Sequence, residues 1–288
     1  NMLTWPVAMV GWVTSLVQRA AASQERINEF LHTPSEIKNP TDRHSEIYGN
    51  IEYRNVSFAY PTGSLGATIP VLKNVSFSVK KGETLAITGR IGSGNSTVAN
   101  LICRMYDVSS GEIFIDGHNI SKINLNDLRT AVGYVPQEVF LFSDTIANNI
   151  AFGNPTPLNH TTPSNRERDV HAQKRGAIEK AAKDAAIYSN IMEFPEKFET
   201  VIGERGITLS GGQKQRISIA RAIVKSPGIL LLDDCLSAVD TETEDEIFSN
   251  LKQLMADKTT IIISHRISSV RHADHILVLD KGSIAEYG

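Results

Sequence analysis

Nine residues, Gly89-Arg90-Ile91-Gly92-Ser93-Gly94-Asn95-Ser96-Thr97, form a glycine-rich stretch between two runs of different character. The run before it, Thr84–Thr88, predicts a strand, and Ser96–Met105 predicts a helix. Four residues separate Gly89 from Gly94, as in the phosphate-binding pattern G-x-x-x-x-G-K-[ST]. Backbone N–H groups can converge on a polyphosphate there, because no side chains block them and the helix adds its positive end. The stretch, called the glycine loop below, therefore predicts a phosphate site, although an ordinary strand-to-helix turn is the alternative.

The composition is that of a soluble globular protein. The 288 residues are 41% hydrophobic and 21% charged, with a net charge of -3, which suits one large or two small domains. Because the chain has neither a global positive field nor a local basic patch, the sequence argues against nucleic acid as a partner. Cys103 and Cys235 fit no metal-ligand spacing and indicate reduced cysteines in a cytosolic compartment.

The N-terminal run Met2–Val17 carries no charge and is strongly apolar. It is shorter than the roughly 20 residues that cross a bilayer, and Arg19 and Arg26 follow it. This order predicts the end of a transmembrane helix that leaves the membrane on the cytoplasmic side, with a buried amphipathic helix as the alternative. We expect residues 1–24 to form that helix end and its extension, residues 25–50 a linker, and residues 51–288 one domain.

The remaining sequence predicts an α/β fold with a smaller antiparallel part. Ile51–Tyr60 and Val71–Val79 share the phrase NVSF and predict two paired antiparallel strands. Further strand signals alternate with helical stretches and predict a mainly parallel sheet: Thr84–Thr88, Glu112–Asp116, Val132–Val135, Ile229–Asp233 and Thr260–Ser264. Residues 140–225 predict an inserted helical subdomain, in which the polar, proline-containing residues 154–173 predict an exposed loop.

Two carboxylates follow the most apolar of these strands. Ile229–Leu232 is a run of four apolar residues, and Asp233 and Asp234 come directly after it. A buried parallel strand that delivers acidic groups to a magnesium-phosphate site has this pattern. A core strand that runs into a turn is the alternative.

The stretch Leu209–Arg216 (LSGGQKQR) predicts the start of a helix. Ser210 and Gln213 have the spacing of a capping box, which opens a helix that continues through Val224. Two glycines in a first turn reduce helix stability, but they leave bare N–H groups at the positive helix end. We interpret this turn as a second phosphate site, although a well-capped structural helix has the same cap.

The five residues LSGGQ (Leu209–Gln213), together with the other motifs in their order, resemble the signature of ATP-binding cassette (ABC) ATPases. The resemblance runs from about Ile51 to Gly288. It implies a P-loop NTPase core and a composite site in which ATP and Mg²⁺ lie between two such domains. The glycine loop of one domain would then face Ser210, Gly211, Gly212 and Gln213 of the other.

The resemblance also implies roles for single residues near the glycine loop. Tyr60 matches the aromatic that stacks on adenine; without the other motifs it would be read as a core aromatic. Ser96 matches the hydroxyl that ligates Mg²⁺, and Asp233 matches the carboxylate linked to it. Gln137 matches the residue that senses Mg²⁺ and the γ-phosphate, or else is a polar turn residue.

Two later segments match motifs of the same family. Ser237–Asp240 matches the segment that crosses the dimer interface, with Val239 in place of the usual Leu. Asp240 can also be a plain helix N-cap. His265 matches the switch histidine that contacts the γ-phosphate, whereas a lone histidine at a strand end is most often incidental.

Two positions depart from the family pattern. Asp234 replaces the catalytic Glu and is shorter by one C–C bond of about 1.5 Å, and a misplacement of about 1 Å can cost a hundredfold in rate. Asn95 replaces the Lys that supplies a charge to the β- and γ-phosphates. A charge pair at 4 Å is worth about 4 kcal/mol at an effective dielectric near 20. Even if this energy is reduced severalfold, its loss predicts that nucleotide binding is weaker and turnover slower, each by about one to three orders of magnitude.

The resemblance as a whole implies the nucleotide-binding domain of an ABC exporter, on the cytoplasmic side of a cell membrane. Its partners would be transmembrane domains and a second ABC subunit. Because Asp234 is typical of the degenerate site in heterodimeric bacterial exporters, a heterodimer is favoured over a homodimer. The alternatives are a silent regulatory ATP-binding module, favoured by Asn95 and Asp234 together, and a soluble non-transport ABC ATPase.

Overall fold

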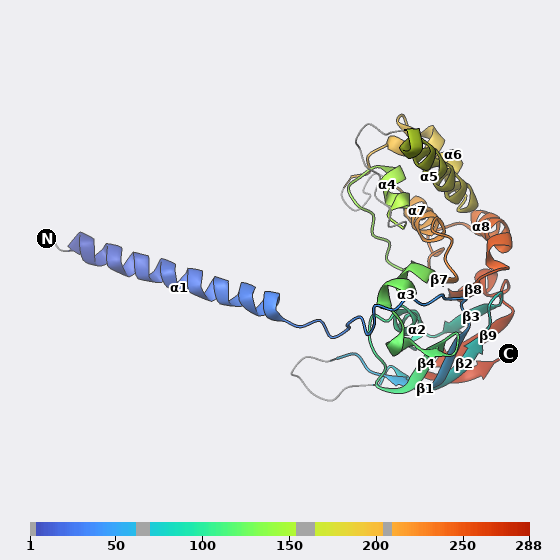
Figure 1. Cartoon of the computed structure of the whole chain (residues 1–288), viewed down its shortest axis with the longest axis horizontal. Helices are drawn as coiled ribbons and strands as arrows, with labels where there is room; N and C mark the ends of the chain where they lie inside the picture. Colours follow the sequence, from blue (N-terminus) through green and yellow to red (C-terminus); the bar gives the residue numbers. More distant parts are fainter. Residues whose placement is uncertain (1–3, 62–69, 154–164, 204–208) are drawn as a thin grey trace. The chain divides into compact units, whose positions relative to one another are not determined.

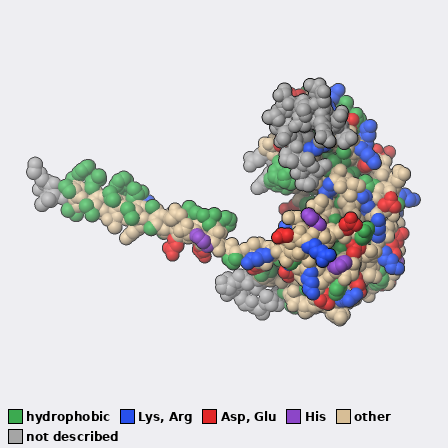
Figure 2. Space-filling model, viewed as in Figure 1, with side chains coloured by type: hydrophobic (Ala, Val, Ile, Leu, Met, Phe, Trp, Pro, Cys, Tyr) green, Lys and Arg blue, Asp and Glu red, His purple; other side chains and the backbone are tan. Residues whose placement is uncertain are grey.

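The computed structural model describes residues 4–61, 70–153, 165–203 and 209–288, and divides the chain into two units, residues 1–38 and 39–288. The first unit contains one helix, α1 (Thr4–His32). Exposed apolar side chains lie along the helix, among them Trp5 at 72% and Phe30 at 81%, and charged side chains follow the apolar N-terminal part (Figure 2). Within the described residues, none of the helices combines the length and apolar character needed to span a bilayer. Because α1 ends at His32, residues 25–32 of the predicted linker are helical.

The second part of the predicted linker lies on the domain surface. The Asp116 carboxylate accepts hydrogen bonds from the backbone N–H groups of Tyr48 (2.7 Å) and Asn50 (2.9 Å). The Asp127 carboxylate accepts one from the N–H of Ser45 (2.9 Å). Residues 39–50 therefore belong to the second unit, as the division at residue 38 also indicates.

The antiparallel sheet has the strand order β2-β1-β4-β5. It is formed by β1 (Ile51–Phe58), β2 (Leu72–Val79), β4 (Ser110–Ile115) and β5 (His118–Asn119). The pairing of β1 with β2, with Ile51 opposite Val79, confirms the antiparallel pair predicted from the NVSF phrases. The strand predicted at Glu112–Asp116 corresponds to β4, which pairs antiparallel with β1, so its assignment to the parallel sheet is wrong.

The second sheet has the order β10-β9-β3-β8-β7-β6. Its strands are β3 (Thr84–Gly89), β6 (Val132–Val135), β7 (Ile229–Asp233), β8 (Thr259–Ile263), β9 (His275–Asp280) and β10 (Ser283–Tyr287). Neighbours pair parallel except β9 and β10, which are antiparallel. The mainly parallel sheet is therefore confirmed, whereas β9 and β10 are not among the strands predicted above.

Strand β7 is buried on both faces and joins the two hydrophobic cores. Ile229 and Leu231 pack into the core between the two sheets, and Leu230 and Leu232 pack into the core beneath the helices. Successive side chains of a strand point to opposite faces, so a strand covered on both sides must be apolar at every position. The rigid strand thereby places Asp233, its last residue, at the carboxyl edge of the sheet.

The helices fall into a group at the sheets and a separate helical subdomain (Figure 1). Those of the first group are α2 (Asn95–Ile102), α3 (Leu125–Ala131), α8 (Thr241–Met255), α9 (Ile267–Val270) and the 3₁₀ turn η1 (Ile120–Lys122). The subdomain contains α4 (Ile146–Ala151), α5 (Asn165–Asp184), α6 (Tyr188–Glu193), α7 (Gly211–Ile223) and η2 (Lys197–Glu199). This confirms the inserted helical subdomain. The loop predicted at residues 154–173 is wrong from Asn165 onward, and residues 154–164 lie outside the described residues.

Candidate functional site

The glycine loop joins β3 to α2 and needs glycine at three positions. Gly92 and Gly94 have φ angles of 82° and 99°, a region that side chains rarely adopt. A Cβ atom on Gly89 would lie 2.2 Å from the carbonyl oxygen of Leu279 on β9. The turn therefore requires the two motif glycines, Gly89 and Gly94, and also glycine at position 92, where the backbone conformation rather than the space demands it. Arg90 and Ile91 are exposed, Ile91 by 94%.

The loop leaves backbone donors free at the start of α2. Among the described residues, the N–H groups of Gly92, Gly94, Asn95 and Ser96 have no hydrogen-bond acceptor, whereas the N–H of Thr97 donates to Gly94 O at 3.1 Å. Free N–H groups at the positive end of a helix attract anions. The arrangement is that of an anion cradle.

The Asn95 side chain is turned into the loop. It is only 7% exposed, and its Oδ1 accepts a hydrogen bond from the Ser93 hydroxyl at 3.2 Å. At the position where the phosphate-binding pattern has a cation, this chain therefore has a buried, neutral amide.

Oxygen ligands gather directly beside this cradle. The Ser96 hydroxyl donates to Asp233 Oδ1 at 3.0 Å, and the Tyr134 hydroxyl donates to Asp233 Oδ2 at 3.3 Å. Gln137, which follows β6, places its Nε2 3.5 Å from Asp234 Oδ2. These residues meet because β6 and β7 are parallel neighbours whose carboxyl ends share one sheet edge. The sequence motifs give Tyr134 no role, because its contact with Asp233 arises from the pairing of β6 with β7.

Burial is the main cause of the shifted pKa values of Asp233 and Tyr134. Asp233 is 2% exposed, and burial raises the pKa of its carboxyl, while the hydrogen bonds from Ser96 and Tyr134 oppose that rise. Burial and then the charge of Asp233 raise the pKa of the Tyr134 phenol, so Tyr134 acts as a donor. His265, which is exposed, follows β8, the parallel neighbour of β7, and so lies at the same sheet edge as Asp233.

The residues present fit a phosphate and a hard cation. Mg²⁺ prefers oxygen ligands and is held by one or two carboxylates together with phosphates and water. Ser96 and Asp233 offer such ligands, Gln137 lies at the same sheet edge, and the free N–H groups of the loop suit phosphate oxygens. In the described part of the chain, no group of three or more His, Cys, Asp or Glu residues could hold a metal. Phosphate oxygens would supply further ligands to a cation held by Ser96 and Asp233.

Tyr60 is connected to the glycine loop from the antiparallel sheet. Its hydroxyl lies 3.1 Å from Thr97 Oγ1, and Asn100 Nδ2 donates to it at 3.4 Å. The half-buried ring makes edge-on contacts with Phe58 (4.9 Å between centroids) and Tyr106 (5.2 Å). Tyr60 thus lies beside the cradle and packs against the core.

The signature turn forms a helix start with both parts of the predicted cap. The Gln213 N–H donates to Ser210 Oγ (3.2 Å), and the Ser210 N–H donates to Gln213 Oε1 (2.9 Å). Helix α7 extends to Ile223, which confirms the predicted capped helix. Within the described residues, no hydrogen bond joins this turn to the glycine loop of the same chain.

The turn lies instead against the segment Ser237–Asp240. A Cβ atom on Gly212 would come within 3.1 Å of the Ala238 carbonyl oxygen, and one on Gly211 within 3.2 Å of the Ala238 Cβ. Asp240 is the N-cap of α8, because its Oδ1 accepts from the Thr243 N–H at 2.9 Å. The structural interpretation of Asp240 is therefore confirmed, and its role toward a ligand stays a prediction.

The structure thus divides the predicted residues into two groups. Residues 89–97, 137, 233, 234 and 265, with Tyr60 at the border, meet at the carboxyl edge of the parallel sheet. Residues 210–213 and 240 lie at the starts of α7 and α8. A composite site between two chains is the arrangement in which both groups could contact one ligand.

Comparison with known proteins gives consistent similarities. The family profile of the ABC transporter matches residues 72–237. The chain is 42% identical over its full length to an ATP-dependent lipid A-core flippase of Pseudomonas fluorescens (strain Pf0-1) and covers 45% of that protein. It is also 42% identical to YknU of Bacillus subtilis (strain 168), an uncharacterized ABC transporter ATP-binding protein, of which it covers 46%.

A solved structure of a bacterial Atm1-family ABC exporter with ATP bound is similar over the entire chain. The TM-score is 0.81 at 36% sequence identity, and the match covers 47% of that exporter chain. The present chain therefore spans less than half the length of these relatives.

Proposed function

This chain belongs to the ABC transporter family, and on that premise we propose that it is the nucleotide-binding domain of an ABC exporter. It binds ATP and Mg²⁺ at the glycine loop, in a protein that couples ATP binding and hydrolysis to transport across the membrane. The observation that carries this proposal is the 3.0 Å hydrogen bond between Ser96 and Asp233 beneath the free N–H groups of the loop. It brings a hydroxyl and a buried carboxylate to the place where a phosphate-bound cation would need them.

Some residues at this sheet edge bind the nucleotide and the cation, and others take part in hydrolysis. The free N–H groups of the loop would hold phosphate oxygens, and Ser96, Asp233 and Gln137 would hold Mg²⁺, which would neutralise phosphate charge. Asp234 orients the attacking water as general base. His265 donates to the γ-phosphate, and Tyr60 packs on the adenine.

The second group of residues serves a neighbouring subunit. We propose that Ser210–Gln213 faces the ATP held by the glycine loop of a second ABC subunit, with Asp240 at the same interface. Transmembrane domains and location on the cytoplasmic side of a cell membrane complete this proposal. Its support is the separation of the two groups within the domain and the greater length of the similar proteins.

The two departures from the family pattern, Asn95 and Asp234, favour the weakly hydrolytic subunit of a heterodimer. Asp234 reaches less far than the family's Glu, and the buried amide of Asn95 supplies no charge. A silent regulatory ATP-binding module is the second candidate, because both changes occur in the same site. ATPase activity of the complex with the partner subunit separates the two: turnover by that complex supports the exporter, and none supports the module.

Magnesium dependence tests the proposed site. Asp233→Asn removes the carboxylate beside Ser96, so we expect the chain to bind ATP with an affinity that no longer depends on Mg²⁺. Asp280→Asn, at the exposed end of β9, is the matched control and should retain the dependence. Calorimetric titration with and without Mg²⁺ measures both. Equal dependence in Asp233→Asn and wild type would contradict the proposed site.

A further inference from the structure

The segment Ser237–Val239 is held from one side by a glutamine of helix α7. Gln215 is 6% exposed; its Nε2 donates to Ser237 Oγ at 3.1 Å, and its Oε1 accepts from the Ala238 N–H at 3.0 Å. One side chain thus satisfies a hydroxyl and a backbone donor of the same turn. No other acceptor for the Ala238 N–H is found among the described residues.

An arginine holds the same segment from the other side. Arg266 directly follows His265, and its guanidinium donates to the carbonyl oxygens of Ser237 (2.8 Å) and Val239 (2.9 Å). It also donates to Glu244 Oε2 at 3.0 Å. The Glu244 side chain is 0% exposed, so the ion pair fixes the guanidinium to helix α8.

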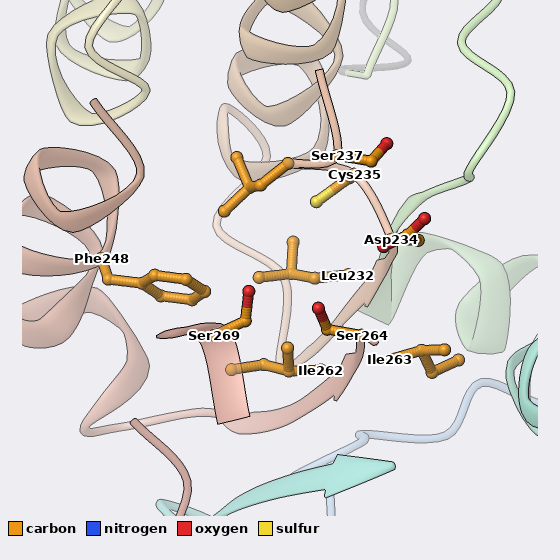
Figure 3. A pocket seen from close by; sticks show the side chains of 10 residues that line it. Leu232, Asp234, Cys235, Ser237, Phe248, Ile262, Ile263, Ser264 and Ser269 are labelled. Atoms are coloured by element: carbon orange, nitrogen blue, oxygen red, sulfur yellow. The ribbon is translucent and has the colours of Figure 1, made fainter. Parts of the chain in front are cut away.

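Val239 packs into the hydrophobic core, but the packing beneath the segment is incomplete. A cavity of about 10 Å³ lies beneath it, with Cys235 and Ser237 above and Ser264 and Ser269 below in the view of Figure 3. Such a space is too small for more than one water molecule, yet its walls lack contacts on one side. The polar contacts from Gln215 and Arg266 therefore add to the core packing of Val239 and to the backbone hydrogen bonds of the turn in holding the segment.

We propose that Gln215 and Arg266 are positioning residues that hold Ser237–Val239 from opposite sides and thereby join the signature helix α7 to the loop of His265. Gln215 belongs to α7, and Arg266 is the neighbour of the histidine. A displacement at His265 must move or break the contacts of Arg266 with Ser237 and Val239, and the Gln215 contacts pass that change to α7.

The functional consequence rests on the proposed function. The glycine loop and His265 serve the nucleotide of this chain, and the signature turn serves that of the partner. Gln215 and Arg266 are then the side chains through which one site influences the geometry of the other.

Amide hydrogen exchange at Ala238, followed by NMR in the chain without nucleotide, tests the two-sided contact. Gln215→Met removes the acceptor and should speed exchange about tenfold, and Gln215→Glu, which keeps an acceptor oxygen, should restore protection. Arg266→Met should also speed exchange severalfold, although Arg266 does not contact this N–H. Should Arg266→Met fail to fold, Arg266→Lys keeps the charge near Glu244 and should show a smaller effect of the same sign.

Arg271→Met is the matched control. Arg271 follows α9 and pairs with Asp245 of α8, one residue along from Glu244, without a hydrogen bond to the segment. It should leave exchange at Ala238 unchanged. Unchanged exchange in Gln215→Met, or equal effects of Arg266→Met and Arg271→Met, would overturn the inference.

A second measurement tests whether ATP binding changes helix α7 through Gln215. Saturating ATP and Mg²⁺ should alter amide exchange in the first turn of α7 in the wild-type chain. Gln215→Met should keep the ATP affinity within about twofold and lose that alteration. An alteration equal to wild type would overturn the inference. If the wild-type chain bound no ATP, the proposed function would fail, and the nucleotide-free exchange at Ala238 would still decide the inference.

Discussion

Asp234 directly follows strand β7 and has a backbone φ of 43°, in the left-handed region that Asp tolerates better than most residues. Its N–H donates to Ile263 O at 2.8 Å, and this hydrogen bond holds the backbone to β8. How far the carboxylate extends therefore depends on the length of the side chain alone. Its carboxylate comes only within 3.5 Å of Gln137 Nε2. The missing C–C bond is therefore not compensated by the main chain.

Asp234→Glu should raise ATP turnover by up to about a hundredfold and leave ATP affinity almost unchanged, because the longer side chain reaches the attacking water. Phosphate release by the complex with the partner subunit, compared with direct ATP titration, measures the two effects. Asp280→Glu is the control for an added methylene at a strand end. A rise in affinity with no rise in turnover would contradict the assigned role.

The buried, charged carboxylate of Asp233 lowers the free energy of unfolding. Burial raises its pKa in the folded chain above the ordinary value of 3.8, so the folded state binds a proton more readily than the unfolded state. The free energy of unfolding therefore falls as pH rises from that ordinary value through the raised one.

Asp233→Asn should raise the free energy of unfolding at pH 7 by on the order of 1 kcal/mol, because it removes a buried charge. The amide can still accept from Ser96 and donate to the Tyr134 hydroxyl. Urea unfolding at pH 7 and near pH 4 measures the change, and the gain should shrink at the lower pH. A loss of stability at pH 7, relative to Asp280→Asn, would show that the charged form is favoured.

At the scale of elements, Arg221 of α7 connects that helix to the chain before and within α4. Its guanidinium donates to Phe140 O (2.7 Å), Asn149 O (2.8 Å) and Asn149 Oδ1 (2.8 Å). It also lies 5.6 Å from the ring centroid of Phe142. Burial lowers the pKa of Arg221 to about 10, so it stays charged at neutral pH.

Arg221→Met should destabilise the chain by about 3 kcal/mol, because carbonyl groups arranged around a cation lose their donor. Urea unfolding measures the loss. Arg175→Met provides the comparison, since Arg175 is an exposed residue of α5 that pairs with Glu179 of the same helix. Similar losses in both variants would exclude a special role of Arg221.

The starts of α7 and α8 show how a structural and a ligand role can share residues. Ser210 and Asp240 cap their helices, which sequence spacing predicts. The close approach of Gly211 and Gly212 to Ala238 gives these glycines a packing reason as well. The cost of two glycines in a first turn is thus explained within one chain, and the contact with a partner's ATP stays a prediction.

At the scale of the molecule, local patterns predict most of the elements that carry the site. Strand β7 and its two carboxylates could be placed because a strand buried on both faces must be uniformly apolar. The glycine loop could be placed because its geometry demands glycine. These features depend on neighbours in sequence, so no tertiary information was needed.

Other features depend on partners far along the chain. The sequence of β4 does not reveal that it pairs with β1, and the start of α5 at Asn165 is polar enough to suggest a loop. The contacts of Tyr134 with Asp233 and of Arg266 with Glu244 arise from strand order and helix packing. Single-sequence patterns contain no signal for such pairings.

ATP titration of the wild-type chain and Asn95→Lys, in the presence of Mg²⁺, tests most directly whether this chain binds ATP through the glycine loop. We expect weak, saturable one-to-one binding by the wild type and binding at least about tenfold tighter by Asn95→Lys, because a charge replaces a buried amide beside the phosphates. Asn126→Lys, in the first turn of α3, controls for an added charge and should change nothing. Unchanged affinity in Asn95→Lys, or no saturable binding by either chain, would contradict ATP binding at this loop.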